Sequence, residues 1–198
     1  MTFNGEYADT IHRHVVVWLD EHIGVPGNNE TMKNRFRRIT YPLHTFIDVQ
    51  STIDFIHQQD ENNKTVFLIT SGTLGEHIVA QIYNLTCLRQ ILIFCGNMNH
   101  HRKWAEDYIE KILMFDSDEE LLIRLTNEVA NYLMEEARRY EEQDNIERAA
   151  GLLDWATWLY NDVDLLQREI CRKVREHVQQ QRRQLTIDYR IAHPNQFA

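Results

Sequence analysis

No apolar run in this sequence approaches the roughly 20 residues that a membrane-spanning helix needs. The N-terminal stretch MTFNGEYADTIHRH also lacks the apolar core of a secretory signal peptide. We therefore expect no membrane association and a cytoplasmic location.

An excess of positive charge is also missing. The 198 residues carry a formal net charge of −9, whereas a nucleic-acid binder needs a basic face for its phosphate contacts. The composition therefore predicts that nucleic acid is not a partner.

Cysteine is scarce, and its pattern is informative. Cys87, Cys95 and Cys171 are an odd, scattered set without a CxxC spacing. Such a set predicts reduced thiols rather than a disulfide framework or a cysteine metal site.

The first half of the chain does contain a regular alternation of strands and helices. Five apolar runs of strand length are separated by segments of helical period: Val15–Leu19, His44–Ile47, Val66–Ile69, Ile91–Phe94 and Ile112–Phe115. This rhythm predicts an α/β domain in which a parallel sheet has helices on both faces. Such sheets place their chemistry just beyond the carboxyl ends of the strands.

The second half is helical. Ser117 and Glu120 form a capping-box pattern, and helical periodicity then continues to about Leu185, interrupted only at Asp144–Asn145 and Asn161–Asp162. The small and aromatic spacing resembles a single tetratricopeptide repeat, whose period is about 34 residues. It is carried by Leu133, Ala137, Tyr140, Ile146, Ala149, Leu153 and Ala156. Alanines at helical spacing also occur in any close helical hairpin.

This helical extension predicts an interaction surface. A lone helix pair cannot bury its apolar face, so it must stack on the sheet domain, on a second copy or on further repeats. The expected buried surface consists of Trp155, Trp158, Leu159 and Tyr160, and the expected partner is a protein or another copy of the chain. Basic residues also gather near the C-terminus, as a solvated face or a docking site for an acidic partner: Arg172, Lys173, Arg175, Arg182 and Arg183.

Two polar strand ends suggest a comparison with phosphorelay receivers. Asp20–Glu21 follows the first strand, and Asp116 ends the fifth. Residues 14–130 resemble the flavodoxin-like receiver and TIR domains, which implies a five-stranded sheet of order 2-1-3-4-5. The resemblance makes Asp20 and Glu21 the acidic pair, but Thr70–Ser71 stands at the phosphoacceptor position and Asp116 at the lysine position. We therefore expect a degenerate receiver-like site, in which Asp20–Glu21 is either a ligand site or a solvated strand end.

The TIR resemblance suggests a catalytic carboxylate. In enzymatic TIR domains, a glutamate after the strand that corresponds to the one ending near Ser71 cleaves the glycosidic bond of NAD, where a carboxylate stabilises an oxocarbenium-like centre. The resemblance makes Glu76 the candidate. Its alternative role is that of a first-turn carboxylate facing the helix dipole.

The segment from Ser71 to Gly75 has a further interpretation. Two glycines and two hydroxyls before a helix that begins at Glu76 direct N–H groups at an anion, beside the switch point of the sheet. The candidate binding residues, including those after the fourth strand, are Ser71, Gly72, Thr73, Gly75, Gly96 and Asn97. The ligand would be NAD or another nucleotide; otherwise the glycines tighten a strand–helix connection.

Adjacent histidines at His100–His101 raise the question of a metal. Neighbouring side chains at a helix start point in different directions, and no third ligand joins them at helical spacing. We expect helix capping and surface exposure at both histidines, and no metal.

A more specific resemblance rests on the segments Val17–Asp20, Phe46–Asp48, Ile69–Gly75, Ile78–Val79, Phe94–Asn97 and on Trp104. The run from Val15 to Phe115 resembles a receiver-like or TIR-like domain of large invertebrate proteins. There it often precedes an arginine-specific ADP-ribosyltransferase domain or a repeat array. The resemblance implies that any transferase activity belongs to another domain.

These observations lead to one preferred interpretation. We expect an α/β domain over residues 14–130, a TPR-like hairpin with a capping helix over 131–185, and tails at 1–13 and 186–198. The preferred function is a non-catalytic signalling or assembly module. The alternatives are an NAD glycohydrolase that uses Glu76 and a nucleotide or anion sensor at the Ser71–Gly75 loop.

Overall fold

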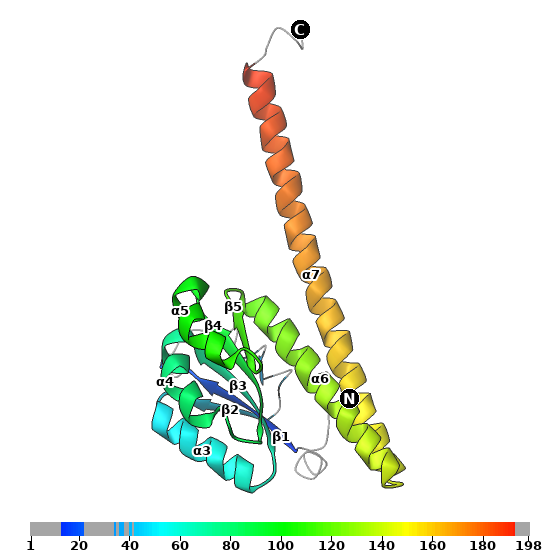
Figure 1. The fold of residues 1–198 in the computed structure, drawn as a ribbon. Helices are drawn as coiled ribbons and strands as arrows, with labels where there is room; N and C mark the ends of the chain where they lie inside the picture. Colours follow the sequence, from blue (N-terminus) through cyan, green and yellow to red (C-terminus); the bar gives the residue numbers. More distant parts are fainter. Residues whose placement is uncertain (1–12, 22–33, 35, 38–39, 41, 193–198) are drawn as a thin grey trace.

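A five-stranded parallel sheet forms the centre of the protein in the computed structural model, which describes residues 13–21, 34, 36–37, 40 and 42–192. The strands are β1 (His14–Leu19), β2 (Leu43–Phe46), β3 (Thr65–Ser71), β4 (Leu88–Phe94) and β5 (Ile112–Phe115). Their order is β2-β1-β3-β4-β5, so the α/β class and the flavodoxin-like order are confirmed (Figure 1).

The burial of the strands follows from their place in the sheet. All six residues of β1 are buried, and so are Val66 to Thr70 in β3, because helices cover both faces of these central strands. The edge strand β2 is only half-buried. Successive side chains of a strand point to opposite faces, so β1 contributes Val15 and Val17 to one core and Val16 and Trp18 to the other.

Three helices cover one face of the sheet: α3 (Val49–Glu61), α4 (Gly72–Ile82) and α5 (Met98–Ala105), which continues into the single turn η1 (Glu106–Tyr108). Each helix begins at a side chain that accepts a backbone hydrogen bond. Asp48 accepts from Ser51, Ser71 from Leu74 and Asn97 from His100. These caps place all three helix starts at the carboxyl edge of the sheet.

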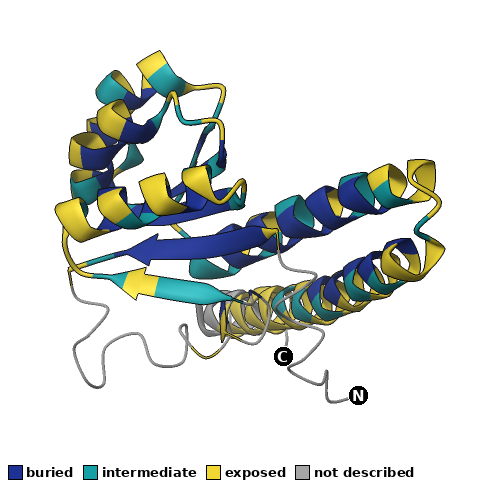
Figure 2. Ribbon diagram, turned by 90° about the horizontal axis from the view of Figure 1, so that it is seen from below, coloured by how far each residue is buried: buried dark blue, intermediate teal, exposed yellow. Residues whose placement is uncertain are grey.

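The other face is covered by α6 (Asp118–Glu142) together with the first part of α7 (Ile146–Ala192). Ser117 caps α6 by accepting from the Glu120 amide at 3.3 Å, as its sequence pattern predicts. Figure 2 shows that α6 turns a buried face toward the sheet. The predicted domain boundary after residue 130 falls inside α6, because this helix packs on the sheet along much of its length.

The two helices form an antiparallel pair that reverses at Asp144, which adopts a φ of 58°. Ala137, Ala149 and Ala156 are buried where α6 and α7 approach each other. The predicted interruption at Asn161–Asp162 is wrong, and so is a separate capping helix over 164–185, because α7 is one helix of 47 residues. Val163 is buried on the same face as Leu159, so packing carries the helix through this polar pair.

Beyond the start of α6, α7 continues without support from the described body of the protein (Figure 1). The Lys173 ammonium lies 3.9 Å from the Glu119 carboxylate, which marks the level at which α6 begins. Residues 174–192 rise about 28 Å further at 1.5 Å per residue, and residues 171–184 are all exposed. None of the helices within the described residues is both long and apolar enough to cross a membrane.

Candidate functional site

The carboxyl edge of the sheet brings several of the predicted site residues together. Leu19 of β1 pairs with Thr70 of β3, and Ser71 of β3 pairs with Phe94 of β4. Asp20, Ser71 and Gly96 therefore lie at the ends of three neighbouring strands. This arrangement is the one expected of a parallel sheet. The chemistry available there depends on what each side chain contacts.

The predicted loop from Ser71 to Gly75 is not a loop. Strand β3 ends at Ser71 and helix α4 begins at Gly72, so Gly72, Thr73 and Gly75 belong to the helix. The Ser71 hydroxyl accepts a hydrogen bond from the Leu74 amide at 3.3 Å. The serine therefore acts as an N-cap, and the helix starts four residues earlier than its sequence suggested.

Both glycines of this segment are buried at close contacts. A Cβ atom at Gly72 would collide with the imidazole ring of His101, and one at Gly75 would lie 2.9 Å from Ile93 Cδ1 and 3.2 Å from the Trp104 ring. The glycines allow α4 to approach β4 and α5 closely. Their positions fit the alternative in which they tighten the connection between strand and helix.

The two neighbouring histidines differ in environment. His100 is exposed, but His101 is 8% exposed and its Nδ1 accepts a hydrogen bond from Trp104 Nε1 at 3.3 Å. The expected exposure of His101 is therefore wrong. Its ring packs against Gly72, where any larger residue would leave no room for it. Within the described residues, no group of three His, Cys, Asp or Glu side chains is arranged to hold a metal ion.

Glu76 and Thr73 are exposed residues of α4. The Glu76 side chain makes no hydrogen bond or ion pair with other described residues. A catalytic carboxylate acts through a positioned substrate or a second polar group. Thus the structure places Glu76 at the surface near the carboxyl edge without assembling a catalytic group around it.

The remaining predicted ligands of this edge differ in accessibility. Asp20 is half-buried and Glu21 is exposed, while nothing lies within 4 Å of the place a Gly96 side chain would take. The Asn97 side chain accepts from the His100 amide at 3.3 Å. Beside them, burial and then the Asp116 charge raise the pKa of the Cys95 thiol, which favours the neutral thiol.

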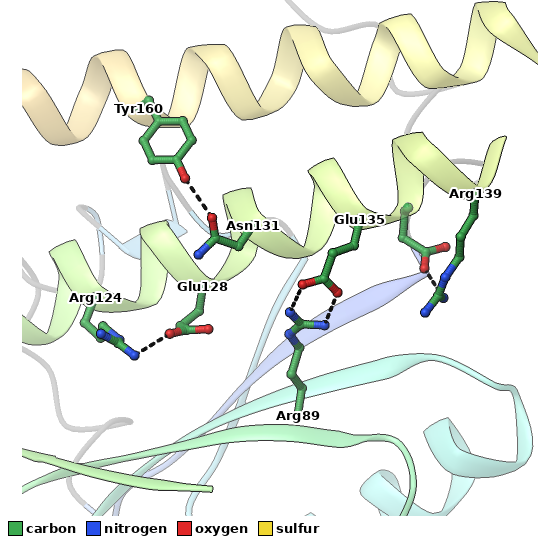
Figure 3. Close-up of polar contacts among 8 residues, drawn as sticks. Arg89, Arg124, Glu128, Asn131, Glu135, Arg139 and Tyr160 are labelled. Carbon is green, nitrogen blue, oxygen red and sulfur yellow. Dashed lines mark hydrogen bonds and ion pairs between the residues drawn. The ribbon is translucent and has the colours of Figure 1, made fainter. Parts of the chain in front are cut away.

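The four predicted interaction residues divide into two pairs. Leu159 is fully buried. The centre of the Trp155 ring lies 5.3 Å from the centre of the His14 ring, within the same chain. Trp158 and Tyr160 are 36% and 39% exposed. The Tyr160 hydroxyl lies 2.9 Å from Asn131 Oδ1 on α6 and donates the hydrogen bond, because the carbonyl oxygen has no proton (Figure 3).

Polar contacts hold α6 on the sheet. The Arg89 guanidinium at the start of β4 donates two hydrogen bonds to the Glu135 carboxylate, at 2.8 and 2.7 Å (Figure 3). The carbon of the same guanidinium lies 5.5 Å from the centre of the Tyr132 ring. The hydrogen bonds from Arg89, and then its charge, lower the pKa of Glu135. The helix pair is therefore a fixed part of the domain rather than a loosely attached arm.

An exposed apolar row on α7 was not recognised from the sequence. Ile146, Leu153 and Tyr160 recur every seven residues and are 60%, 38% and 39% exposed. Val174 continues the same spacing at 57%, with Val178 nearby at 55%. The seven-residue spacing of this row is visible in the sequence. It was missed because the helix was expected to end at Asn161–Asp162, which separates Tyr160 from Val174.

Comparisons of this chain with protein-family models, with curated proteins and with solved structures gave no match.

Proposed function

We propose that this protein is an assembly module that associates through the exposed face of α7. The observation that carries the proposal is the continuation of α7 beyond the body with Val174 and Val178 exposed. Isolated helices shorter than about 12–15 residues are marginal in water, and helices in proteins owe most of their stability to packing. A projecting helix with exposed valines gains that packing from a partner.

The carboxyl edge of the sheet supports a role without catalysis. Ser71 and Asn97 already accept hydrogen bonds from helix amides, and Gly72 and Gly75 serve close packing. A receiver needs an aspartate and a lysine where this chain has Ser71 and Asp116. These features favour a fold that is retained as a scaffold for assembly in a signalling protein.

Sedimentation velocity of the full chain over a range of concentrations tests the proposal. We expect the wild-type mass to rise with concentration and Val178→Asp to remain a monomer, because a buried unpaired carboxylate opposes association. Gln180→Asp is the matched control, since it adds the same charge on another face of the exposed segment. A folded wild-type protein that stays monomeric at every concentration would contradict the proposal.

A further inference from the structure

The exposed surface of α7 carries two rows, in part apolar, that have the spacing of a coiled-coil seam. The first row has a period of seven and consists of Ile146, Leu153, Tyr160, Gln167, Val174 and Gln181. The second row follows four residues behind and consists of Ala150, Thr157, Asp164, Cys171 and Val178. Sustained seven-residue spacing keeps such rows facing a second helix through a left-handed supercoil.

Apart from Thr157 and Gln181, the two ends of these rows are apolar, and the middle is polar. Ile146, Leu153 and Tyr160 lie at one end and Cys171, Val174 and Val178 at the other, and all six are exposed. Asp164 and Gln167 lie between them. A helix that runs in the opposite direction would place apolar ends against each other and polar middles together.

The charges beside these rows change from acidic to basic along α7, which also favours an antiparallel partner. One position of the seven-residue repeat is occupied in turn by Glu147, Asp154, Asn161, Arg168, Arg175 and Arg182. The acidic members belong to the part of α7 that packs on the body, and the basic members follow them, with Arg175 and Arg182 in the projecting part. More broadly, residues 118–162 contain 12 acidic and 4 basic side chains, whereas residues 163–192 contain 7 basic and 4 acidic ones.

We propose that two copies of this chain pair through α7 in an antiparallel, symmetric dimer. The twofold axis passes between residues 165 and 166, so the projecting part of each α7 lies along the acidic helix pair of the other copy. Rows that are self-complementary in this way produce a closed dimer. This inference rests on the proposed function and adds the partner and the register.

The register assigns specific neighbours across the interface. Val178 faces Leu153 of the second copy, and Cys171 faces Tyr160. On the flank, Arg175 faces Asp154, and Arg182 faces Glu147. Asp164 meets Gln167 near the axis, where a polar contact within an apolar seam selects one register over others.

A parallel dimer would not pair these opposite charges. In a parallel, in-register helix pair, this flank faces the opposite flank of the second helix, so Arg175 would lie beside Ile170 and Asp154 beside Ala149 of the second copy. Arg175 makes no ion pair with other described residues of its own chain, which leaves its charge available to a partner. Opposite-charge contacts of this kind set partner orientation in helical pairs.

A charge exchange between Asp154 and Arg175 tests the register. We expect Asp154→Arg and Arg175→Asp each to raise the dimer dissociation constant about tenfold, since each creates two like-charge contacts per dimer. The double variant should restore an affinity close to wild type. Failure of the double variant to recover would overturn the antiparallel register while leaving self-association in place.

Cysteine crosslinking gives an independent readout of direction. In the proposed register, the two Cys171 residues are 11 positions apart along the axis, or about 16 Å, too far for a disulfide. We expect mild oxidation to link the Tyr160→Cys variant through Cys171 into a covalent dimer and to leave Trp158→Cys and wild type unlinked. Rapid Cys171–Cys171 linkage in the wild type would overturn the proposal in favour of a parallel dimer. A wild-type protein that stays monomeric in sedimentation would instead contradict the proposed function itself.

Discussion

Arg89 on β4 and Glu135 on α6 form a two-pronged ion pair that joins the sheet to the helix pair, with nitrogen–oxygen distances of 2.8 and 2.7 Å. The two residues lie 46 positions apart in sequence. Their side chains are 29% and 45% exposed, so water screens the attraction in part. The contact adds to the apolar packing that holds α6, and with it the start of α7, on the sheet.

This ion pair predicts a specific pH dependence of stability. Because Arg89 lowers the pKa of Glu135 in the folded state, the pair stabilises the fold fully above the ordinary glutamate pKa of 4.5. The contribution is lost as the pH falls through the lowered pKa, when the carboxylate becomes protonated. We expect urea unfolding of wild type and Glu135→Gln to differ by about 1 kcal/mol at pH 7 and to converge as the pH falls through that lowered pKa. An unchanged difference at low pH would show that Glu135 acts through packing.

The contact between Gly72 and His101 predicts a steric effect. Gly72→Ala would make the new methyl group clash with the His101 imidazole ring. We expect this clash to lower the free energy of unfolding by about 1–3 kcal/mol. His101→Ala in the same chain should recover part of that loss, because it removes the obstruction. Gly151→Ala is the control. Nothing lies within 4 Å of its added Cβ, so it should stabilise α7 by up to about 1 kcal/mol. Equal destabilisation by both alanines would contradict the steric argument.

The three thiols should differ sharply in reactivity. Cys171 is exposed, whereas Cys87 and Cys95 are buried. Burial and the nearby Asp60 raise the pKa of Cys87 to about 12, so its reactive thiolate is rare at pH 8. We expect a thiol reagent at pH 8 to label one cysteine rapidly in the native protein and all three in denaturant. Rapid labelling of Cys87 would indicate local opening of the segment beside α3.

Glu76 provides the test that separates assembly from catalysis. We expect concentrated, folded protein to release no nicotinamide from NAD, and Glu76→Ala to behave like wild type. The reason is that Glu76 is an exposed residue of α4 with no polar partner among the described residues. Release that disappears in Glu76→Ala would establish the TIR-like glycohydrolase and contradict a non-catalytic role.

The helix caps show how much local sequence predicts. Ser117 follows a polar residue, precedes three acidic residues and begins α6 as the capping-box pattern indicates. The same local rule identifies Asp48 before α3. Capping is a contact between residues three apart, so its signal survives in the sequence alone.

The Ser71–Gly75 segment shows where local rules fail. Its glycines indicate a loop, yet α4 begins at Gly72 with Ser71 as its cap, and the glycines leave room for His101, Ile93 and Trp104. Those neighbours come from β4 and α5, and glycine in a helix has no local signature that distinguishes it from glycine in a turn. The burial of His101 has the same origin.

The course of α7 depended on tertiary packing in a similar way. Asn161–Asp162 is a reasonable break by propensity, but Leu159 and Val163 on either side are buried in the fold, and the helix passes through.

The sequence by itself determined the five strands and several helix starts, because apolar runs and caps are short-range patterns, whereas the strand order was expected only from the resemblance to flavodoxin-like domains. Only the tertiary structure decided which apolar residues of the helical half are covered. Leu159 enters the core through contacts with distant segments, whereas Val174 and Val178 lie beyond the level at which α6 begins. The exposure of an α7 residue depends on whether the body of the protein covers it, so the proposed association surface could be located only after the fold was known.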